Sequence, residues 1–270
     1  MEATGITVNV HESRSAGDLE AQAGELARSE AGRLVVAGGD GSVHEAVNGI
    51  MAAGGKAELG VVPTGTGNDF AKAAQIPLDW EAATRLLARR IKDGAPPRAI
   101  DVGKMNDRYF ANGAGIGLDA KVTRIARSYR WPVGELVYLL AIFRAMLDDL
   151  ATPEIEIRSD ELQWNGPLTL ASISNGPWIG GMFYIAPMAL NDDGVLELII
   201  AGPVTRLRIL QLLPKLMRGQ HMDEPDISHA SVQRVSITAA EPLPSHLDGE
   251  VQPLHTSFEL EILPGVLMLL

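Results

Sequence analysis

Two runs of apolar residues, each followed by a glycine-rich turn and a helical pattern, dominate the first third of the chain. Residues 33–47 read RLVVAGGDGSVHEAV, the pattern of a buried strand that ends at glycines and continues as a helix. Residues 59–63 (LGVVP) predict a second short strand, followed by a loop over 64–68 and a helix over 69–74. Two such units in succession predict a parallel sheet whose loops share the carboxyl edge, where open α/β sheets bind ligands.

Apolar positions on either side of these units predict one more strand and two helices. Residues 6–10 alternate like a strand, and residues 18–29 and 80–95 have apolar side chains at helical spacing. The second of these helices ends before Pro96 and Pro97, which cannot continue a helix. We therefore place the first domain boundary at this proline pair.

After residue 98 the pattern changes to short alternating strands with turn residues between them. The strands are expected over residues 99–104, 108–113, 154–159, 168–174, 195–201, 232–239 and 256–262. A series of short strands after an α/β region predicts an antiparallel sandwich or barrel as a second domain. A ligand cleft is expected between the two domains.

Two apolar stretches interrupt these strands and predict helices. Residues 133–150 place five large apolar residues on one side of a helix, and residues 207–217 do the same with three leucines. The simplest interpretation of each pattern is a helix that packs on the sheet through its apolar side. The first helix also follows aromatic and basic residues that suit a membrane interface. Its apolar side consists of Leu136, Leu139, Leu140, Phe143 and Leu147.

Composition narrows the class of protein. The 270 residues are 46% hydrophobic and 21% charged, which is an ordinary globular balance with room for two domains. The formal net charge of −11 argues against nucleic acid as a partner, because nucleic-acid binding needs a basic face. The absence of cysteine excludes disulfides, thiol catalysis and Cys-ligated zinc. With no secretory signal and no apolar stretch of membrane-spanning length, we expect a cytoplasmic protein.

The first glycine-rich turn has the chemistry of a phosphate site. Gly38, Gly39 and Gly41 lack a Cβ, so the backbone can turn sharply and a ligand can approach it closely. The amides that open the helix at Ser42 have no partners inside the helix and can bind phosphate. By itself Gly-Gly-Asp-Gly can equally be a tight structural turn.

A second loop of the same kind favours nucleotide phosphates over a structural turn. This loop consists of Gly65, Thr66, Gly67 and Asn68. Beside the two loops, Asp40 and Asp69 supply the acidic oxygens that suit Mg²⁺ next to a polyphosphate. The chain contains no G-x-x-x-x-G-K-[ST] motif, which excludes the P-loop NTPases.

Together the two loops resemble the catalytic domain of diacylglycerol kinases, in particular the bacterial soluble lipid kinases. That family has Gly-Gly-Asp-Gly-Thr followed by Pro-x-Gly-Thr-Gly-Asn-Asp-Phe-Ala, and the matches are residues 38–42 and 63–71. Ser42 keeps the hydroxyl of the family threonine. NAD kinases and phosphofructokinases also carry Gly-Gly-Asp-Gly, whereas the Gly-Thr-Gly-Asn-Asp-Phe loop points to lipid kinases.

The resemblance implies an α/β + β architecture of the type shared by NAD kinases and diacylglycerol kinases. An N-terminal Rossmann-like nucleotide-binding domain is expected over 1–98, followed by a β-sandwich domain for the lipid substrate over 99–262. Residues 263–270 are a candidate return to the first domain.

Two acidic positions in the β-rich part are expected to bind a cation. Asp101 stands inside an apolar strand and needs a partner, such as a metal or an ordered water shared with Asp40 and Asp69. The resemblance also implies a structural Mg²⁺ site. Its ligands would be the Leu190 carbonyl, the Asp193 carboxylate and the Val195 carbonyl.

Two further motifs remain. Residues 113–119 are rich in glycine but lack the G-x-G-x-x-G spacing of a dinucleotide site. They resemble the Gly-x-Gly-hydrophobic-Asp-Ala turn of the family, which implies a structural loop that lines the cleft. Asp-Gly-Glu at 248–250 would be a polar turn by sequence alone. The resemblance implies that Glu250 is the general base, with Asp248 as a metal-directed or alternative base, while Asp40 acts at the catalytic metal.

These observations predict an ATP-dependent lipid kinase that phosphorylates a hydroxyl of diacylglycerol or a related lipid alcohol. ATP is the expected co-substrate and Mg²⁺ the cofactor. The lipid would be reached by peripheral contact at the inner membrane face, and a homodimer is left open.

Two alternatives also stay open. One is an NAD kinase-like enzyme, which would lack the Gly-Thr-Gly-Asn-Asp-Phe loop. The other is a catalytically impaired nucleotide- or lipid-binding regulator. Two features motivate the regulator alternative. The first strand and helix of the family precede the position of Met1, and His11 occupies a position where the family commonly has threonine.

Overall fold

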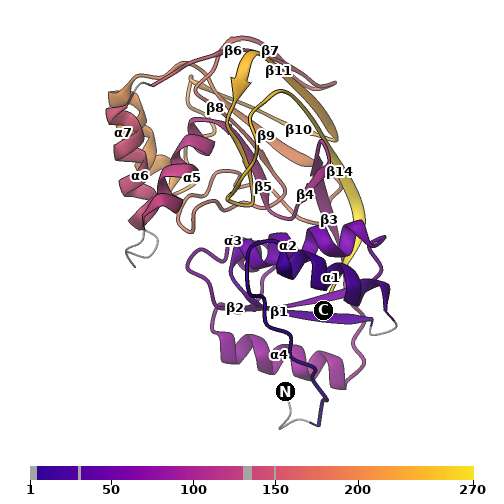
Figure 1. Cartoon of the computed structure of the whole chain (residues 1–270). Coiled ribbons are helices and arrows are strands. Elements are labelled where there is room, and N and C mark those ends of the chain that lie inside the picture. Colours follow the sequence, from indigo (N-terminus) through magenta and orange to yellow (C-terminus); the bar gives the residue numbers. More distant parts are fainter. Residues whose placement is uncertain (1–4, 30–31, 130–135, 149) are drawn as a thin grey trace.

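The structure is a computed structural model that describes residues 5–29, 32–129, 136–148 and 150–270. Helices α1 to α4 surround strands β1 and β2 at one end of the molecule, and a β-sandwich forms the other end (Figure 1). Helices α5, α6 and α7 lie together beside the sandwich. The expected α/β domain followed by a β-sandwich is confirmed.

The α/β part is built on one parallel strand pair. Strands β1 (Arg33–Gly38) and β2 (Glu58–Pro63) are parallel and in register along their whole length. Each strand runs into a loop and then a helix, α2 (Asp40–Ala52) after β1 and α3 (Asp69–Ala73) after β2. The predicted strand–loop–helix units are therefore present, and both loops lie at the carboxyl edge.

Two further helices cover this pair. Helix α1 (Asp18–Arg28) packs on α2 so closely that a Cβ on Gly49 would overlap the α1 backbone. Helix α4 (Trp80–Lys92) packs its Leu87 against Gly60 of β2, and the Asp79 side chain caps its first turn. The two helices predicted from apolar periodicity are confirmed.

The strand predicted over residues 6–10 is absent. These residues form no ladder, and β1 is the edge strand of its sheet. Alternation alone does not make a strand, because backbone pairing with a neighbour defines it. Ile6 and Val8 line a surface groove beside β1 but form no strand pairing with β1.

Two sheets form the sandwich among the described residues. The first has the order β1-β2-β14-β11-β6-β7, with β3 paired to β14 and β4 paired to β3. Its remaining strands are β14 (His255–Leu269), β11 (Arg234–Leu243), β6 (Glu154–Arg158), β7 (Gln163–Pro167), β3 (Arg98–Met105) and β4 (Arg108–Phe110). The second sheet consists of β10 (Ile227–Val232), β9 (Leu196–Ala201), β8 (Leu170–Ser174), β5 (Gly113–Gly117), β12 (Ser245–Leu247) and β13 (Glu250–Val251). Fully buried side chains such as Phe110, Ile157 and Phe258 fill the space between the sheets.

Strand β14 joins the two parts of the molecule. It pairs antiparallel with β11 and β3, and its last residues, Met268 and Leu269, pair in parallel with β2. The register shifts between Leu263 and Leu267, around Gly265 with its positive φ of 63°. One hydrogen-bonded sheet therefore runs through both parts. The predicted domain boundary at residue 98 remains a proposal.

The glycine-rich stretch at 113–119 is not the loop that we expected. Residues 113–117 form β5, between β8 and β12, and α5 (Leu118–Ser128) follows directly. A Cβ on Gly115 would overlap the side chains of Asp119 and His246. Gly115 thus makes room for these side chains, and Gly117, with a positive φ of 89°, allows the turn into α5.

Helix α6 (Leu136–Leu147) packs on the opposite side from the one predicted. Its buried side contains Ala141, Ile142, Ala145 and Met146, whereas most of the predicted packing side is exposed. The helix is apolar around most of its circumference, so its pattern could not identify the covered side. The small Ala141 and Ala145 face the α5 and α7 (Arg206–Leu216) cluster instead. None of the described helices has the length and apolar composition needed to cross a bilayer.

Candidate active site

The two glycine-rich loops meet backbone to backbone. The Thr64 amide donates a hydrogen bond to the Gly38 carbonyl at 3.0 Å. A Cβ on Gly65 would overlap the Cα of Gly39, so glycine is required where the loops touch. Gly67 likewise leaves room for the carboxylate of Asp40, which would lie 3.0 Å from an added Cβ. The predicted phosphate-binding backbones thus form one continuous surface.

Asn68 holds the second loop in shape. It adopts the left-handed conformation, with φ of 51°. Its side chain accepts a hydrogen bond from the Gly65 amide at 3.1 Å and donates one to the Gly65 carbonyl at 2.8 Å. Thr66, at the tip of this loop, is exposed. Asn68 therefore shapes the loop through its side chain, while the tip stays open to a ligand.

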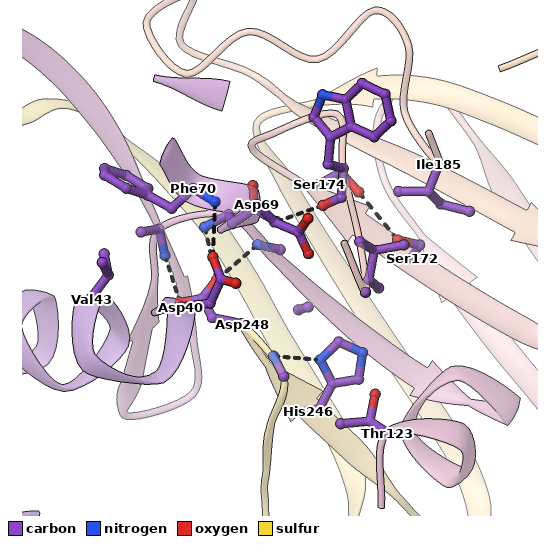
Figure 2. A pocket seen from close by; sticks show the side chains of 18 of the residues that line it. Asp40, Val43, Asp69, Phe70, Thr123, Ser172, Ser174, Ile185, His246 and Asp248 are labelled. Atoms are coloured by element: carbon purple, nitrogen blue, oxygen red, sulfur yellow. Dashed lines mark hydrogen bonds between the residues drawn. The ribbon is translucent and has the colours of Figure 1, made fainter. Parts of the chain in front are cut away.

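Asp40 and Asp69 form a buried carboxylate pair beside these loops (Figure 2). Asp40 accepts a hydrogen bond from the Phe70 amide at 3.0 Å, and Asp69 accepts one from the Gly181 amide at 3.1 Å. Burial and the negative charge of Asp40 raise the pKa of Asp69 to about 6. Burial, together with the charge of Asp248, also raises the pKa of Asp40. Both carboxylates have raised pKa values next to other negative charge, which fits a site for a hard cation.

Lys72 is the nearest cation to this pair. Its Nζ lies 3.5 Å from Asp69, donates a hydrogen bond to the Gly181 carbonyl, and stands 5.5 Å from the centre of the Trp178 ring. Sequence reasoning did not select Lys72, although its place three residues after Asp69 on a helix was a usable signal. Trp178 comes from a distant loop and gave no such signal.

The Asp248 side chain is surrounded by hydrogen-bond donors and is only 3% exposed. It accepts bonds of 2.8 to 3.0 Å from the amides of Ala111, Asn112 and Gly113, and one of 2.9 Å from Nδ1 of His44. Burial alone would raise its pKa, but His44 and these amides hold the pKa of Asp248 below its ordinary value. Both oxygens of Asp248 are engaged, which favours a positioning role. Its role as a metal-directed or alternative base stays a prediction.

Glu250 reaches the first glycine loop from the other domain. An added Cβ on Gly41 would lie 2.8 Å from the Glu250 carboxylate, so the absence of a side chain at Gly41 admits it. Glu250 is also paired with Arg127 of α5, and its side chain is 30% exposed. Glu250 is thus both accessible and next to the predicted phosphate loop.

Asp101 lies apart from the Asp40 and Asp69 pair. Its two oxygens accept hydrogen bonds from the amides of Gly194 and Gly265, both at 2.7 Å. Asp101 is not among the residues that line the pocket of Asp40 and Asp69, and a metal or water shared with them stays a prediction. Its carboxylate is satisfied by backbone groups that lie far away along the chain.

The turn held by Asp101 contains the predicted structural ion site. Partial burial and the charges of Asp101 and Asp192 raise the pKa of Asp193. Within the described residues, no three His, Cys, Asp or Glu side chains converge as a metal cluster. The expected ligand set uses only one carboxylate with the Leu190 and Val195 carbonyls, and the local excess of negative charge fits a cation there.

Two cavities share a wall at this site. The acidic pocket is lined by Asp40, Asp69 and Asp248 together with polar groups of the sandwich (Figure 2). The apolar pocket lies among α5, α6, α7 and strands β8 and β9. Four residues line both cavities: Tyr138, Ile179, Gly180 and Ile185. At the border, Nε2 of His246 lies 3.1 Å from the Asp119 carboxylate. A charged cavity and an apolar cavity therefore adjoin.

This arrangement defines a class of protein. Two glycine-rich loops on an α/β unit, joined by a shared strand to a β-sandwich with an apolar cavity, fit a two-domain phosphotransferase. Comparison with known families supports this class. Residues 1–105 match the diacylglycerol kinase catalytic domain, and residues 113–270 match the YegS C-terminal NAD kinase beta sandwich-like domain. The chain belongs to the diacylglycerol kinase family of lipid kinases and is a kinase enzyme.

Individual relatives are similar to this chain over most of their own length. A diacylglycerol kinase of Bacillus subtilis (strain 168) is 31% identical, over 92% of this chain and 81% of that protein. A YegS-like lipid kinase of Pectobacterium atrosepticum is 32% identical, over 97% of this chain and 86% of that protein. A crystal structure from Bacillus anthracis str. Sterne, described as a candidate diacylglycerol kinase, superposes with a TM-score of 0.77 at 26% identity. The superposition covers 95% of this chain and 82% of the Bacillus anthracis chain.

Proposed function

We propose that the protein transfers the γ-phosphate of ATP to a hydroxyl group of diacylglycerol or a related lipid alcohol, with Mg²⁺ as cofactor. One observation carries this proposal: the acidic pocket with its glycine loops shares a wall with the apolar pocket. A substrate with a polar end and long hydrocarbon chains needs these two environments side by side. The family assignment to lipid kinases supports the same conclusion.

The phosphate end of the reaction would use the first domain. The backbone amides of residues 38–42 and 65–68 would bind the phosphates of ATP. Asp40 and Asp69 would hold Mg²⁺, which, when bound, supplies neutralising charge for the phosphates. Phosphoryl transfer depends mainly on positioning and charge neutralisation, so this chain's contribution is a preorganised cradle.

The lipid end would use the second domain. Apolar side chains of α6, α7 and β9 would surround the hydrocarbon chains, and the hydroxyl would lie at the shared wall. Glu250, which lies against Gly41, would accept the proton of the attacking hydroxyl as the hydroxyl oxygen bonds to the γ-phosphorus and the bond to ADP breaks. Arg127 orients the Glu250 carboxylate before the substrate arrives.

The proposed structural Mg²⁺ is separate from the catalytic one. The Leu190 and Val195 carbonyls and Asp193 would bind it, at the turn that Asp101 fastens to β14. A cation there would offset the negative charge that raises the pKa of Asp193. Its role would be to hold the turn, because none of these three residues lines the acidic pocket.

A kinase assay with several acceptors tests the proposal. Purified protein is incubated with γ-labelled ATP and either dioctanoylglycerol, sphingosine or NAD, with Mg²⁺ or with EDTA. We expect label in a phospholipid extracted into the organic phase, only with Mg²⁺. Label on NAD alone would overturn the lipid substrate. No label on any acceptor, with ATP shown to bind, would favour the regulator alternative.

A further inference from the structure

Tyr138 brings a polar group to the border between the acidic pocket and the apolar pocket. The other described residues that line both cavities are Ile179, Gly180 and Ile185, whose side chains have no polar atom. Tyr138 comes from the first turn of α6, which lies beside the sandwich (Figure 1). A ligand that extends from one cavity into the other must therefore pass this side chain.

Two glycines hold the tyrosine in place. A Cβ built on Gly180 would lie 3.0 Å from carbon atoms of the Tyr138 ring, so the ring packs directly on the Gly180 backbone. A Cβ built on Gly249 would lie 3.7 Å from the Tyr138 hydroxyl oxygen. Gly249 stands between Asp248 and Glu250 in the chain. The hydroxyl of Tyr138 is therefore held beside the turn that presents the proposed base.

The hydroxyl of Tyr138 forms no hydrogen bond with any residue that the structure describes. A largely buried tyrosine usually has such a partner. By contrast, the hydroxyl oxygens of Ser172 and Ser174 in the acidic pocket lie 3.2 Å apart and form a hydrogen bond. The Tyr138 oxygen is also not one of the fully buried atoms without a partner, so a ligand can contact it.

The surroundings of this hydroxyl keep it protonated. Burial, together with the negative charges of Asp69, Asp119 and Asp40, raises the pKa of Tyr138. A protonated tyrosine has one O–H group to donate. A ligand group that lies next to Tyr138 should therefore offer an acceptor oxygen.

The position of the hydroxyl indicates which part of a lipid would meet it, an argument that rests on the proposed function. The attacked hydroxyl of the lipid would lie on the acidic side of the shared wall, and the hydrocarbon chains would lie in the apolar pocket. The atoms at the border are then those that join the two, and in a diacylglycerol these are the ester groups. An ester carbonyl accepts hydrogen bonds and donates none.

We propose that the Tyr138 hydroxyl donates a hydrogen bond to the carbonyl of the ester next to the attacked hydroxyl, and so selects a lipid with an ester at this position. An oxygen of the γ-phosphate is the other acceptor to consider. It fits less well, because the phosphates would lie on the glycine-rich loops at 38–42 and 65–68. None of these loop residues lines the apolar pocket, whereas Tyr138 lines both cavities.

A pair of diester and diether substrates tests this hydrogen bond. Dioctanoylglycerol has two ester carbonyls, and its diether analogue dioctylglycerol has the same chain length and free hydroxyl without a carbonyl. Each lipid is given to the parent and to Tyr138→Phe, which keeps the ring on Gly180 and removes only the hydroxyl. On the diester the variant should lose at least about tenfold in kcat/KM, mainly through KM, because a desolvated carbonyl then has no donor. On the diether the two proteins should agree within about threefold.

The matched control is Tyr184→Phe. Tyr184 is not among the described residues that line either cavity, and its hydroxyl donates a hydrogen bond to the Pro187 carbonyl at 3.3 Å. This variant should turn over both lipids like the parent. Tyr138→Phe should keep the parent's melting temperature, because the contact of the ring with Gly180 remains.

Two kinetic outcomes would overturn the proposal. Equal losses of Tyr138→Phe on the diester and the diether would show that the hydroxyl acts on the phosphate or on the fold and not on the ester. No loss on either lipid would show that the hydroxyl contacts no part of the substrate that matters for turnover.

Lipid binding without ATP separates this inference from the proposed function. In calorimetric titrations Tyr138→Phe should bind dioctanoylglycerol at least about tenfold more weakly than the parent, while both proteins bind dioctylglycerol equally. If this difference is found and the parent phosphorylates no lipid, the proposed function fails and the hydrogen bond stands. If the parent phosphorylates dioctanoylglycerol and the variant does so equally well, the hydrogen bond fails and the proposed function stands. If the parent neither binds nor phosphorylates dioctanoylglycerol, both fail.

Discussion

Asp248 and Glu250 are two residues apart in the chain, yet they have opposite surroundings. Asp248 is buried and accepts four hydrogen bonds, one of them from His44 on the helix of the first glycine loop. Glu250 is partly exposed and lies against Gly41 of the same loop. Asp248 therefore fixes the position of the turn, and Glu250 is the carboxylate that can reach a substrate.

Substitutions at these two residues should separate the two roles. Glu250→Gln keeps the size of the side chain but not its proton affinity, so turnover should fall by roughly 10² to 10⁴ with the melting temperature unchanged. Asp248→Asn places an amide NH₂ among N–H donors in a buried site, so it should cost about 3 kcal/mol of stability as well as activity. Urea denaturation and the kinase assay on both variants measure this. An Asp248→Asn protein of normal stability without activity would make Asp248 the base.

The raised pKa of Asp69 predicts how stability depends on pH. Its pKa is about 6 in the folded protein, against an ordinary 3.8. Between these pH values the folded state keeps a proton that the unfolded chain has lost, so the free energy of unfolding should fall as the pH rises. The difference between these pKa values corresponds to about 3 kcal/mol of stability, which is lost as the pH rises through 6.

Asp69→Asn removes this titration. Urea denaturation in EDTA from pH 4 to pH 7.5 should give a smaller loss of stability for Asp69→Asn than for the parent. Added Mg²⁺ should restore the parent's stability at the higher pH, because a cation favours the ionised pair. Parallel stability curves for the two proteins would contradict the assigned pKa.

At the scale of elements, the site depends on how closely two loops approach. Gly39 and Gly65 touch at a point where any side chain would overlap backbone. Backbone cannot move aside as a flexible side chain can, so the loops would have to separate. The distance between the β1–α2 and β2–α3 connections is therefore set by these glycines.

Gly65→Ala should weaken ATP binding by at least about tenfold, because the amides of the two loops would no longer face one phosphate chain. The helix content should stay the same, since both loops lie outside the helices. The control is Thr66→Ala in the same loop, where the side chain is exposed. Calorimetric titration with ATP compares the variants, and equal affinities would show that the loop contact is unimportant for the nucleotide.

At the scale of the whole molecule, β14 makes the two parts one unit. It pairs with β2 of the α/β part and with β3 and β11 of the sandwich. Asp101 fastens the bend of β14 at Gly265 to the turn at Gly194. A rigid junction keeps Glu250 of the second sheet at a fixed place over Gly41 of the first domain.

This continuity predicts a single cooperative unfolding transition. Trp80 lies in α4 of the α/β part, and Trp164 lies in β7 of the sandwich. Variants that keep Trp80 or Trp164 as their single tryptophan, with the other three replaced by Phe, should report the same melting temperature by fluorescence, provided that each keeps the fold of the parent. Two transitions several degrees apart would show that the parts unfold independently.

The sequence by itself determined the order of the main elements and the family. Apolar periodicity and the placing of glycine and proline act over a few residues, so strands such as β1 and β2 and helices such as α1 and α4 were predictable. The family motifs are also contiguous, and the comparisons confirmed the resemblance. Several short strands were missed, because short segments carry little periodicity. Helix α5 was missed although its apolar residues Leu118, Val122 and Ile125 have helical spacing, because the glycine-rich stretch before it was interpreted as a loop.

Only the tertiary structure decided which groups face one another. The partners of Asp101 and Asp248 are backbone amides far along the chain, so no local pattern could show that these carboxylates are already satisfied. The sequence could not show which side of α6 is exposed, for a related reason. The helix is apolar on several sides, so its neighbours in the fold determine which side is buried. Residues 6–10 show the same limit, since a strand exists only where a partner strand lies beside it.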